Sequence, residues 1–256
     1  MLTLPKPKLG EVFAVTIAST DPEKSLLFYQ QLGFKEVLRY DFPFFWIQIS
    51  DGALLIMLRK DKDPYLALTY YVKDLDQVVK EVEESGIKFS SPPLVFDFIK
   101  RFTIQTPEGF KLSLVTFVDG FAQPNGPTML GMNQSDYFNP EKYVNKVCGM
   151  FGELALPVAD LNESIGFWGK LGFASISRFE SPYPWAIISD GLSTIGLHQT
   201  KNFTEPAITF FAADMKEKIE TLRSAGFGPL QNAENKSSFT ITSPENVKIN
   251  LFKLGM

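Results

Sequence analysis

The stretch FGELALPVADLNESIGFWGKLGF, residues 151–173, predicts a buried strand, a capped amphipathic helix and a glycine that ends the helix. Residues 13–34, FAVTIASTDPEKSLLFYQQLGF, have the same pattern. The cap residues Asp21 and Asp160 are 139 positions apart, and so are the closing residues Phe34 and Phe173. The chain is therefore an internal duplication. The copies differ within the first strand, where Ala14 of the first copy becomes Glu153 in the second.

Each copy of the duplication contains a smaller repeat. In the first copy, strands are predicted at 12–18, 35–40, 45–50, 54–59, 65–72, 102–105 and 111–117, with helices after Asp21 and Asp74. Residues 89–98 are strand-like, but Pro92 and Pro93 limit them to an edge piece. The second copy repeats the Asp-Gly turn of residues 51–52 at 190–191, and the Thr-Pro-Glu-Gly turn of 106–109 as Ser-Pro-Glu-Asn at 243–246.

These repeats predict an α+β fold built from four tandem βαβββ modules. None of the modules can cover its own sheet, so we expect paired half-barrels of curled mixed sheets around a cleft, with the helices outside. The predicted domains are residues 1–118 and 148–256, with two modules each. Residues 119–147 are rich in Gly, Pro, Asn and Gln and are predicted to be a linker. How the four modules pair is left open.

Composition narrows the function. The formal net charge is −4 without a basic run, which argues against binding of nucleic acid or an anionic membrane surface. No apolar run approaches the roughly 18 residues that span a bilayer, and no signal-peptide core precedes the first strand. A single cysteine, Cys148, fits the reducing cytoplasm. A single histidine, His198, excludes sites with two or three His within one chain.

The pattern resembles the vicinal oxygen chelate superfamily, which includes glyoxalase I, bleomycin-resistance proteins, fosfomycin-resistance enzymes and extradiol dioxygenases. The resemblance is carried by residues 19–34, 72–76 and 106–114 and by their copies, and it covers about 12–118 and 150–254. It is specific for the fold, because three separated motifs recur in order, twice. It is weak for function, because the superfamily spans isomerases, transferases, oxygenases and pure binders.

The resemblance also implies where a metal would be held. Metal-binding members resemble one another in having ligands on the first, fourth, fifth and eighth strands of a domain. In the first domain these places fall at residues that are poor ligands: Ala14, Met57 or Arg59, Ala67 and Ser113. In the second domain they fall at Glu153, His198 or Gly196, Ala207 and Asn250. We therefore expect no cofactor, with a divalent metal at Glu153, His198 and Asn250 as the weaker expectation.

Glu153 and His198 are the candidate catalytic residues, as an acid–base pair if they face each other. The alternatives are a partly exposed Glu near a strand start and a solvent-facing His at a strand end. Candidate ligand-binding residues are Asn250, Trp185, Phe211, Phe239 and Arg59. An aromatic trough with few polar groups suits a flat or amphipathic small molecule, although core packing explains many of the aromatic residues equally well.

Three hypotheses follow from the sequence. The first is a binding or sequestering protein of the bleomycin-resistance kind, without a full metal site. The second is a metal-dependent lyase, isomerase or dioxygenase of the glyoxalase kind that uses the second domain. In the third, the degenerate first domain only braces the second or supports a homodimer. Whether the chain is an enzyme is left open.

Overall fold

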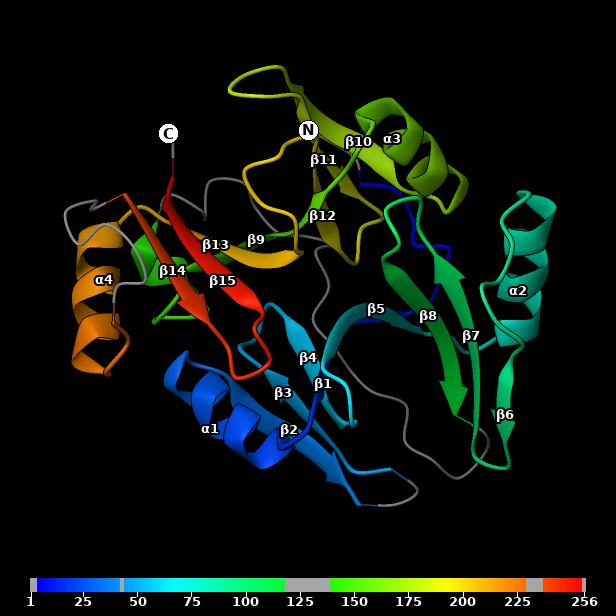
Figure 1. The fold of residues 1–256 in the computed structure, drawn as a ribbon, viewed down its shortest axis with the longest axis horizontal. Coiled ribbons are helices and arrows are strands. Elements are labelled where there is room, and N and C mark those ends of the chain that lie inside the picture. The colour runs from blue at the N-terminus through cyan, green and yellow to red at the C-terminus, as the bar shows by residue number, and fades with distance from the viewer. Residues whose placement is uncertain (1–3, 42–43, 118–138, 229–236, 255–256) are drawn as a thin grey trace. The chain divides into compact units, whose positions relative to one another are not determined.

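The structure is a computed structural model that describes residues 4–41, 44–117, 139–228 and 237–254. Within these ranges the elements follow the predicted repeat, with four α-helices lying outside the strands (Figure 1). The first two modules contain β1 (Val12–Ser19), α1 (Pro22–Gln31), β2 (Lys35–Tyr40), β3 (Trp46–Ser50), β4 (Leu55–Lys60), β5 (Tyr65–Tyr71), α2 (Leu75–Glu84), β6 (Leu94–Phe96), β7 (Ile99–Gln105) and β8 (Lys111–Phe117).

The second half begins with a short 3-10 turn, η2 (Pro140–Lys142), inside the segment predicted to be a linker. The elements that follow are β9 (Met150–Pro157), α3 (Leu161–Lys170), β10 (Ala174–Phe179), β11 (Trp185–Ser189), β12 (Thr194–His198), β13 (Ala207–Ala212), α4 (Met215–Ser224), β14 (Ser238–Thr242) and β15 (Lys248–Lys253). The segment between α4 and β14 includes residues 229–236, which lie outside the described part of the chain.

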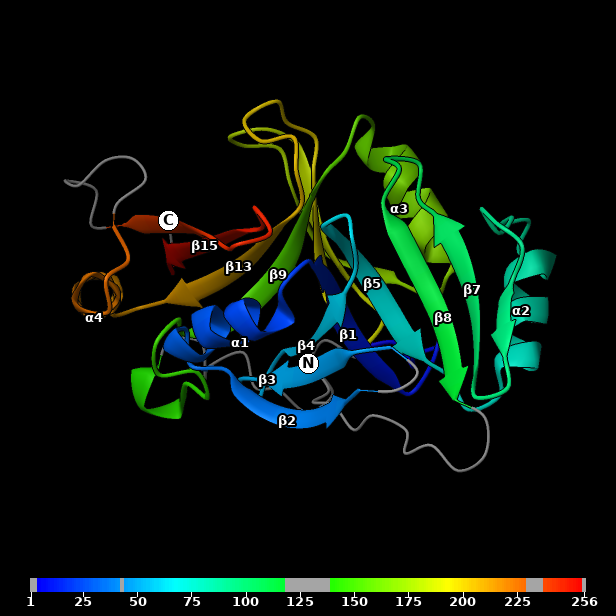
Figure 2. The ribbon, with the colours of Figure 1, turned by 60° about the horizontal axis from the view of Figure 1, so that its bottom comes forward.

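The strands form two mixed sheets that are not closed. One has eight strands in the order β2-β3-β4-β1-β5-β8-β7-β6, and the other has seven in the order β10-β11-β12-β9-β13-β15-β14. The pairs β5–β8 and β13–β15 are parallel, whereas β2–β3, β3–β4, β10–β11 and β11–β12 are antiparallel. The predicted α+β class with βαβββ modules is confirmed, and Figure 2 shows helix α1 and the strands of its module from a second side.

The helices begin and end where the sequence predicts. Asp21, Asp74 and Asp160 each accept a backbone N–H of the first helical turn with their side chains, which satisfies donors that have no partner inside the helix. After α1, Gly33 has a φ of +89°, the left-handed conformation of a helix stop. Gly172 does the same after α3, with a φ of +93°.

The edge of the first sheet differs from the prediction. Strand β7 begins at Ile99 rather than at residue 102, because β6 and β7 form a hairpin in which Phe96 pairs with Ile99. Within the strand-like run of 89–98, Phe89 makes only an isolated bridge to Ile104. The two prolines at 92–93 therefore separate a bridge from a three-residue edge strand, as the missing proline N–H groups require.

The residues divide into two compact units, and each is built from separate stretches of the chain. Unit 1 contains Met1–Val15, Ala67–Leu130 and Leu156–Thr204, and unit 2 contains Thr16–Leu66, Gly131–Ala155 and Glu205–Met256. Each unit thus combines strands from both halves of the duplication. The domain boundaries given above stay predictions, and residues 118–138 of the linker region lie outside the described residues.

Within each unit, a serine on a helix contacts the glutamate of a distant hairpin turn. In unit 2, Ser25 on α1 donates to Glu245 of the Ser-Pro-Glu-Asn turn. In unit 1, Ser164 on α3 donates to Glu108 of the Thr-Pro-Glu-Gly turn. Because Ser164 follows Ser25 by 139 residues, the duplication has preserved this contact in both units.

No helix in the described ranges is long and apolar enough to cross a membrane.

Candidate functional site

A row of polar side chains crosses four strands of unit 2. Register pairs Glu153 on β9 with Thr209 on β13, Thr209 with Asn250 on β15, and Asn250 with Thr240 on β14. Side chains that are paired across neighbouring strands lie on the same face of a sheet. The four residues Glu153, Thr209, Asn250 and Thr240 therefore form one line, which we call the polar row.

The opposite face of the same strands is apolar. Ile208 and Phe210 on β13, and Ile249 and Leu251 on β15, are almost completely buried. They alternate with Thr209 and Asn250, as the two-residue period of a strand requires. The polar row thus interrupts strands that are otherwise apolar. Burial of polar groups is costly unless they are hydrogen-bonded, so the position of the row requires a chemical explanation.

Burial increases along the polar row toward β9. Asn250 and Thr240 are half-buried, whereas Thr209 and Glu153 are only 1% and 4% exposed. The hydroxyl Oγ1 of Thr240 donates to Oδ1 of Asn250 at 2.9 Å, which fixes the amide and directs its Nδ2 donor along the sheet face. The expectation that Glu153 is partly exposed is wrong, because β9 is covered over nearly its whole length.

Two phenylalanines flank the polar row. Phe211 and Phe252 are half-buried neighbours on β13 and β15, with ring centroids 6.4 Å apart. The Phe211 ring lies over Gly152, where an added Cβ would come within 2.2 Å of the ring. Glycine at 152, the residue before Glu153, is therefore required for the Phe211 ring to approach β9 this closely. The row thus combines an aromatic wall with a buried carboxylate.

His198 lies in unit 1 and is surrounded by aromatic rings. It ends β12, is 8% exposed, and stacks on Trp185 of β11 with centroids 5.5 Å apart and planes 5° apart. The Tyr183 hydroxyl lies 3.4 Å from Nδ1 of His198, and the Phe203 ring meets it edge-on. The expectation of a solvent-facing histidine is wrong, because this aromatic cluster covers the ring. Phe179 continues the stack on Trp185 at 4.2 Å.

In the first module, Arg59 occupies the place that His198 occupies in the third module. Across β2, β3 and β4, Tyr40 pairs with Trp46 and Trp46 pairs with Arg59, the same pattern as Phe179, Trp185 and His198. The Arg59 guanidinium lies 5.6 Å from the Phe44 ring centroid and 3.8 Å from Asp61. Arg59 therefore ends a row of paired side chains on β2, β3 and β4 of unit 2, and His198 ends the equivalent row on β10, β11 and β12. We call these two rows the ladders.

The structure separates the residues predicted to bind a ligand. Glu153, Phe211 and Asn250 share one sheet face of unit 2. Phe239 pairs with Leu251 on the opposite, apolar face and is 6% exposed. Trp185 and His198 lie in unit 1. The acid–base pairing of Glu153 with His198 stays a prediction, because each residue is described within its own unit.

Sequence reasoning missed Thr209, Thr240, Tyr183 and Phe203. The two threonines could have been found by aligning β13, β14 and β15 of the fourth module with β9, because the register puts them in line with Asn250. Tyr183 and Phe203 lie in loops on either side of β11 and β12, where no periodicity indicates the direction of a side chain.

Donor chemistry argues against the metal set implied by the resemblance. The polar row offers one carboxylate, one amide and two hydroxyls, whereas first-row metals prefer several imidazole, thiolate or carboxylate ligands. In the described ranges, no group of three His, Cys, Asp or Glu side chains could hold a metal ion. The side chains present therefore do not fit that ligand set.

The free cysteine is not a nucleophile in this fold. Cys148 is completely buried, and burial raises the pKa of its thiol well above the usual range. A thiol held in its protonated form reacts poorly. Its Sγ lies 3.5 Å from the backbone oxygen of Leu32, which gives it a packing role.

Comparison with known proteins agrees with this architecture. Residues 12–114 match the model of the Glyoxalase/Bleomycin resistance protein/Dioxygenase superfamily. A search of curated proteins gave no match. Similar solved structures include homoprotocatechuate 2,3-dioxygenase from Brevibacterium fuscum (E323L mutant), with 16% identity, a TM-score of 0.59, and coverage of 98% of this chain and 73% of that one.

Two further similar structures are also dioxygenases. The 2,3-dioxygenase LapB from Pseudomonas sp. KL28 has 14% identity and a TM-score of 0.57, covering 100% of this chain and 94% of that one. The 2,2',3-trihydroxybiphenyl 1,2-dioxygenase from Sphingomonas wittichii strain RW1 has 15% identity and a TM-score of 0.56, covering 98% and 91%. At these identities the likeness concerns the fold. Residues 12–114 are thus similar to the Glyoxalase/Bleomycin resistance protein/Dioxygenase superfamily, and the chain as a whole has the vicinal oxygen chelate fold.

Proposed function

We propose that the protein binds a small aromatic molecule with phenolic hydroxyls on the face of unit 2 that carries the polar row. The observation that carries the proposal is the buried carboxylate of Glu153 at the end of the polar row, on the strand that the Phe211 ring covers at the neighbouring Gly152. The dioxygenases of similar fold are named for catechol-type compounds, which supports the choice of ligand class.

Each part of the row has a chemical task in this proposal. The carboxylate of Glu153 accepts a hydrogen bond from a phenolic hydroxyl, and such charge-assisted bonds are stronger than neutral ones. The amide of Asn250 donates to a second oxygen of the ligand. The rings of Phe211 and Phe252 pack against the aromatic ring of the ligand.

The donor chemistry of the row favours binding over metal-dependent turnover. One carboxylate can orient a phenol, but the row has no further His, Cys, Asp or Glu to hold a first-row metal beside it. We therefore rank a binding or sequestering protein of the bleomycin-resistance kind first. Its proposed partner is the small molecule, and it needs no cofactor.

Calorimetric titration of the full chain with catechol and with homoprotocatechuate tests the proposal. Because Glu153→Gln keeps the shape of the side chain but removes the charge, we expect the affinity to fall about tenfold, with a smaller loss in Asn250→Ala. Thr242→Val is the matched control, because Thr242 lies on β14 two residues beyond the row. Equal affinities in the wild type and Glu153→Gln, or no heat with either phenol, would overturn the proposal.

The alternative is a metal-dependent lyase, isomerase or dioxygenase, and the names of the similar structures favour the dioxygenase. Oxygen uptake with catechol, measured after the protein is incubated with Fe(II) and freed of excess metal, discriminates between the two. The binding proposal expects uptake no faster than with an equal amount of free Fe(II). A protein-dependent rate that Glu153→Gln abolishes would establish the alternative.

We further propose that the protein works in the cytoplasm as two tandem domains, residues 1–118 and 148–256, and forms a homodimer. The single cysteine, Cys148, which is buried and free, supports the first point, and the duplication supports the second. The homodimer would account for a first domain that carries fewer polar site residues than the second. Light scattering on the purified full chain tests it, and a mass of one chain at micromolar concentration would contradict it.

A further inference from the structure

A separate pocket lies in unit 1, where helix α2 ends and the chain returns toward β6. Its volume is about 510 Å³. It is lined by Glu83, Gly86, Ile87, Lys88, Phe89, Pro93 and Phe102. All of these residues belong to the second module, and none of them belongs to the polar row of unit 2.

The walls of this pocket are anchored by backbone contacts. Phe89 forms a bridge with Ile104 of β7, and Ser90 donates its N–H to the carbonyl of Thr103 at 2.8 Å. Ile87 donates back to the carbonyl of Val82 on α2 at 3.3 Å. The segment that carries the pocket residues is therefore held at both ends, and ligand binding need not order it first.

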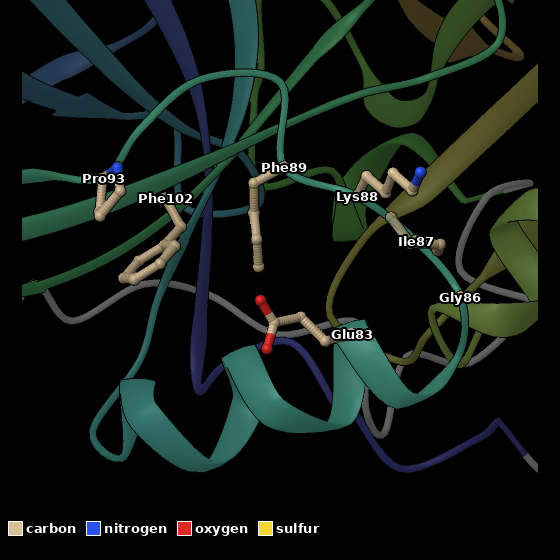
Figure 3. A pocket seen from close by; sticks show the side chains of 7 residues that line it. All are labelled: Glu83, Gly86, Ile87, Lys88, Phe89, Pro93 and Phe102. Atoms are coloured by element: carbon tan, nitrogen blue, oxygen red, sulfur yellow. The ribbon is translucent and has the colours of Figure 1, made fainter.

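Two aromatic rings form one side of the pocket. Phe89 and Phe102 meet edge to face, with ring centroids 4.9 Å apart. Figure 3 shows both rings directed into the space above α2, with Pro93 beside them. Aromatic faces carry negative charge density and attract cations that have lost part of their hydration.

A carboxylate points into the same space. In Figure 3 the Glu83 side chain rises from α2 toward Phe89 and Phe102, whereas the Lys88 ammonium is turned away from them. Charges of neighbouring glutamates are directed elsewhere: Glu81 accepts from Gln77 at 2.7 Å, and Glu84 lies 3.8 Å from Lys80. Glu83 is thus the acidic group that serves the pocket.

Without a cation nearby, the charge of Glu83 destabilises the C-terminal end of helix α2. The last turn of α2 contains no basic residue, although the C-terminal end of a helix carries partial negative charge and favours cations. A carboxylate there is repelled by the helix end unless a cation lies nearby. The helix end, the Glu83 carboxylate and the two ring faces all favour a cation in the pocket.

We propose that this pocket binds an organic ammonium ion with an apolar or aromatic substituent. The ammonium group lies between the Glu83 carboxylate and the rings of Phe89 and Phe102, and the substituent packs against Ile87 and Pro93. Neutral and anionic analogues of the same shape bind more weakly, because the carboxylate and the ring faces attract positive charge.

Amide chemical shifts of the isotope-labelled full chain test the proposal, with benzyltrimethylammonium as the probe. We expect saturable shifts at Gly86, Lys88 and Phe89, and no comparable shifts with phenylacetate or benzyl alcohol. Glu83→Gln should weaken probe binding by about threefold to tenfold. Glu84→Gln is the matched control, because it removes the same charge from the same helical turn outside the pocket, and it should change the affinity less than twofold.

Three outcomes would overturn the proposal. These are equal loss of affinity in Glu83→Gln and Glu84→Gln, equal binding of phenylacetate, or shifts that avoid residues 86–89. Phe102→Leu provides a second check, because it keeps the pocket apolar but removes one ring, and it should weaken the binding of benzyltrimethylammonium. The result is independent of the phenol titration, which is read on variants of unit 2.

Discussion

The same Asp-Gly turn occurs in both units, but its aspartate has different partners. In unit 2, Oδ1 of Asp51 accepts the N–H groups of Ala53 and Leu54, and Oδ2 accepts from the side-chain amide of Asn145 at 2.9 Å. In unit 1, Oδ1 of Asp190 accepts from Leu192 and Ser193, and Oδ2 accepts from the Tyr70 hydroxyl at 2.7 Å.

In each unit, the hydrogen bonds to Oδ1 of the aspartate are local, and the hydrogen bond to Oδ2 is long-range. The turn itself fixes Oδ1, so the duplication has preserved this contact. The Oδ2 contact ties the turn to a residue about a hundred positions away in the chain, and here the two copies have diverged. A repeated module thus preserves its own turn, whereas its long-range hydrogen bond is made with a different donor in each unit.

Removal of Asp190 should have the largest effect. Asp190 is fully buried, and its loss in Asp190→Ala leaves two backbone N–H groups without an acceptor and the Tyr70 hydroxyl with Ser193 as its remaining partner. We expect a loss of about 3–5 kcal/mol in the free energy of unfolding, measured by denaturant titration. Asp51→Ala, at a slightly exposed turn, should lose less, about 2–4 kcal/mol. An equal or reversed order would break the comparison.

A change at Asn145 should make unit 2 sensitive to pH. Oδ1 of Asn145 accepts from the N–H groups of Val147 and Cys148, so the side chain cannot reverse. In Asn145→Asp the second oxygen would face the Asp51 carboxylate, and two buried carboxylates must share a proton. We expect a loss of about 2–3 kcal/mol at pH 8 that largely disappears near pH 4.

The direction of this pH dependence follows from the pKa values of the two carboxyl groups. Burial already raises the pKa of Asp51 above its ordinary value of 3.8, and a second carboxylate raises it further. A group whose folded-state pKa is raised contributes stability at low pH, which is lost as the pH rises through that value. Tyr70→Phe in unit 1 is the control, and its loss of about 1–2 kcal/mol should be the same at pH 5 and pH 8. Parallel pH profiles for the two variants would contradict the argument.

These contacts also show what the sequence can and cannot predict. Helix caps, glycine stops and Asp-Gly turns depend on neighbours within four residues, and the sequence predicts them, although Asp214 before α4 makes no side-chain cap hydrogen bond. The partners of the turn aspartates were not, because Asn145 lies in a segment predicted to be a linker and Tyr70 is 120 positions from Asp190. Tyr70 is fully buried, and burial together with the charge of Asp190 raises its pKa well above the usual range.

The same limit applies to the candidate site. Alternation along a strand puts Phe211 on the face of Thr209, because Phe211 lies two residues after Thr209 on β13. It could not assign Phe239, because its face depends on the register between β14 and β15, and a shift of one residue reverses every side chain. Register is a long-range property of these sheets.

The serine–glutamate contacts should respond more weakly than the aspartates. Glu245 is 8% exposed and also accepts from Ser243, so Ser25→Ala leaves a buried carboxylate with one donor fewer. We expect Ser25→Ala to lose about 1–2 kcal/mol and Ser164→Ala about 0.5–1 kcal/mol, because Glu108 is only half-buried. Thermal unfolding of both variants measures the difference, and a larger loss in Ser164→Ala would mean that burial does not set the strength of this contact.

The smallest effect should come from exchange of the residues that end the two ladders. Arg59 and His198 each pair with a tryptophan on the neighbouring strand. His198, however, stacks on Trp185 with planes 5° apart inside a covered aromatic cluster. Arg59 is only half-buried beside Trp46. A guanidinium can stack on an aromatic ring, so the loss in His198→Arg should be about 0.5–1 kcal/mol, and Arg59→His should lose less than about 0.5 kcal/mol. Near-ultraviolet circular dichroism distinguishes a retained stack from a lost one, because only a rigid tryptophan gives a strong signal. A lost Trp185 signal in His198→Arg would show that unit 1 requires the imidazole itself, and that the two ladders are not interchangeable.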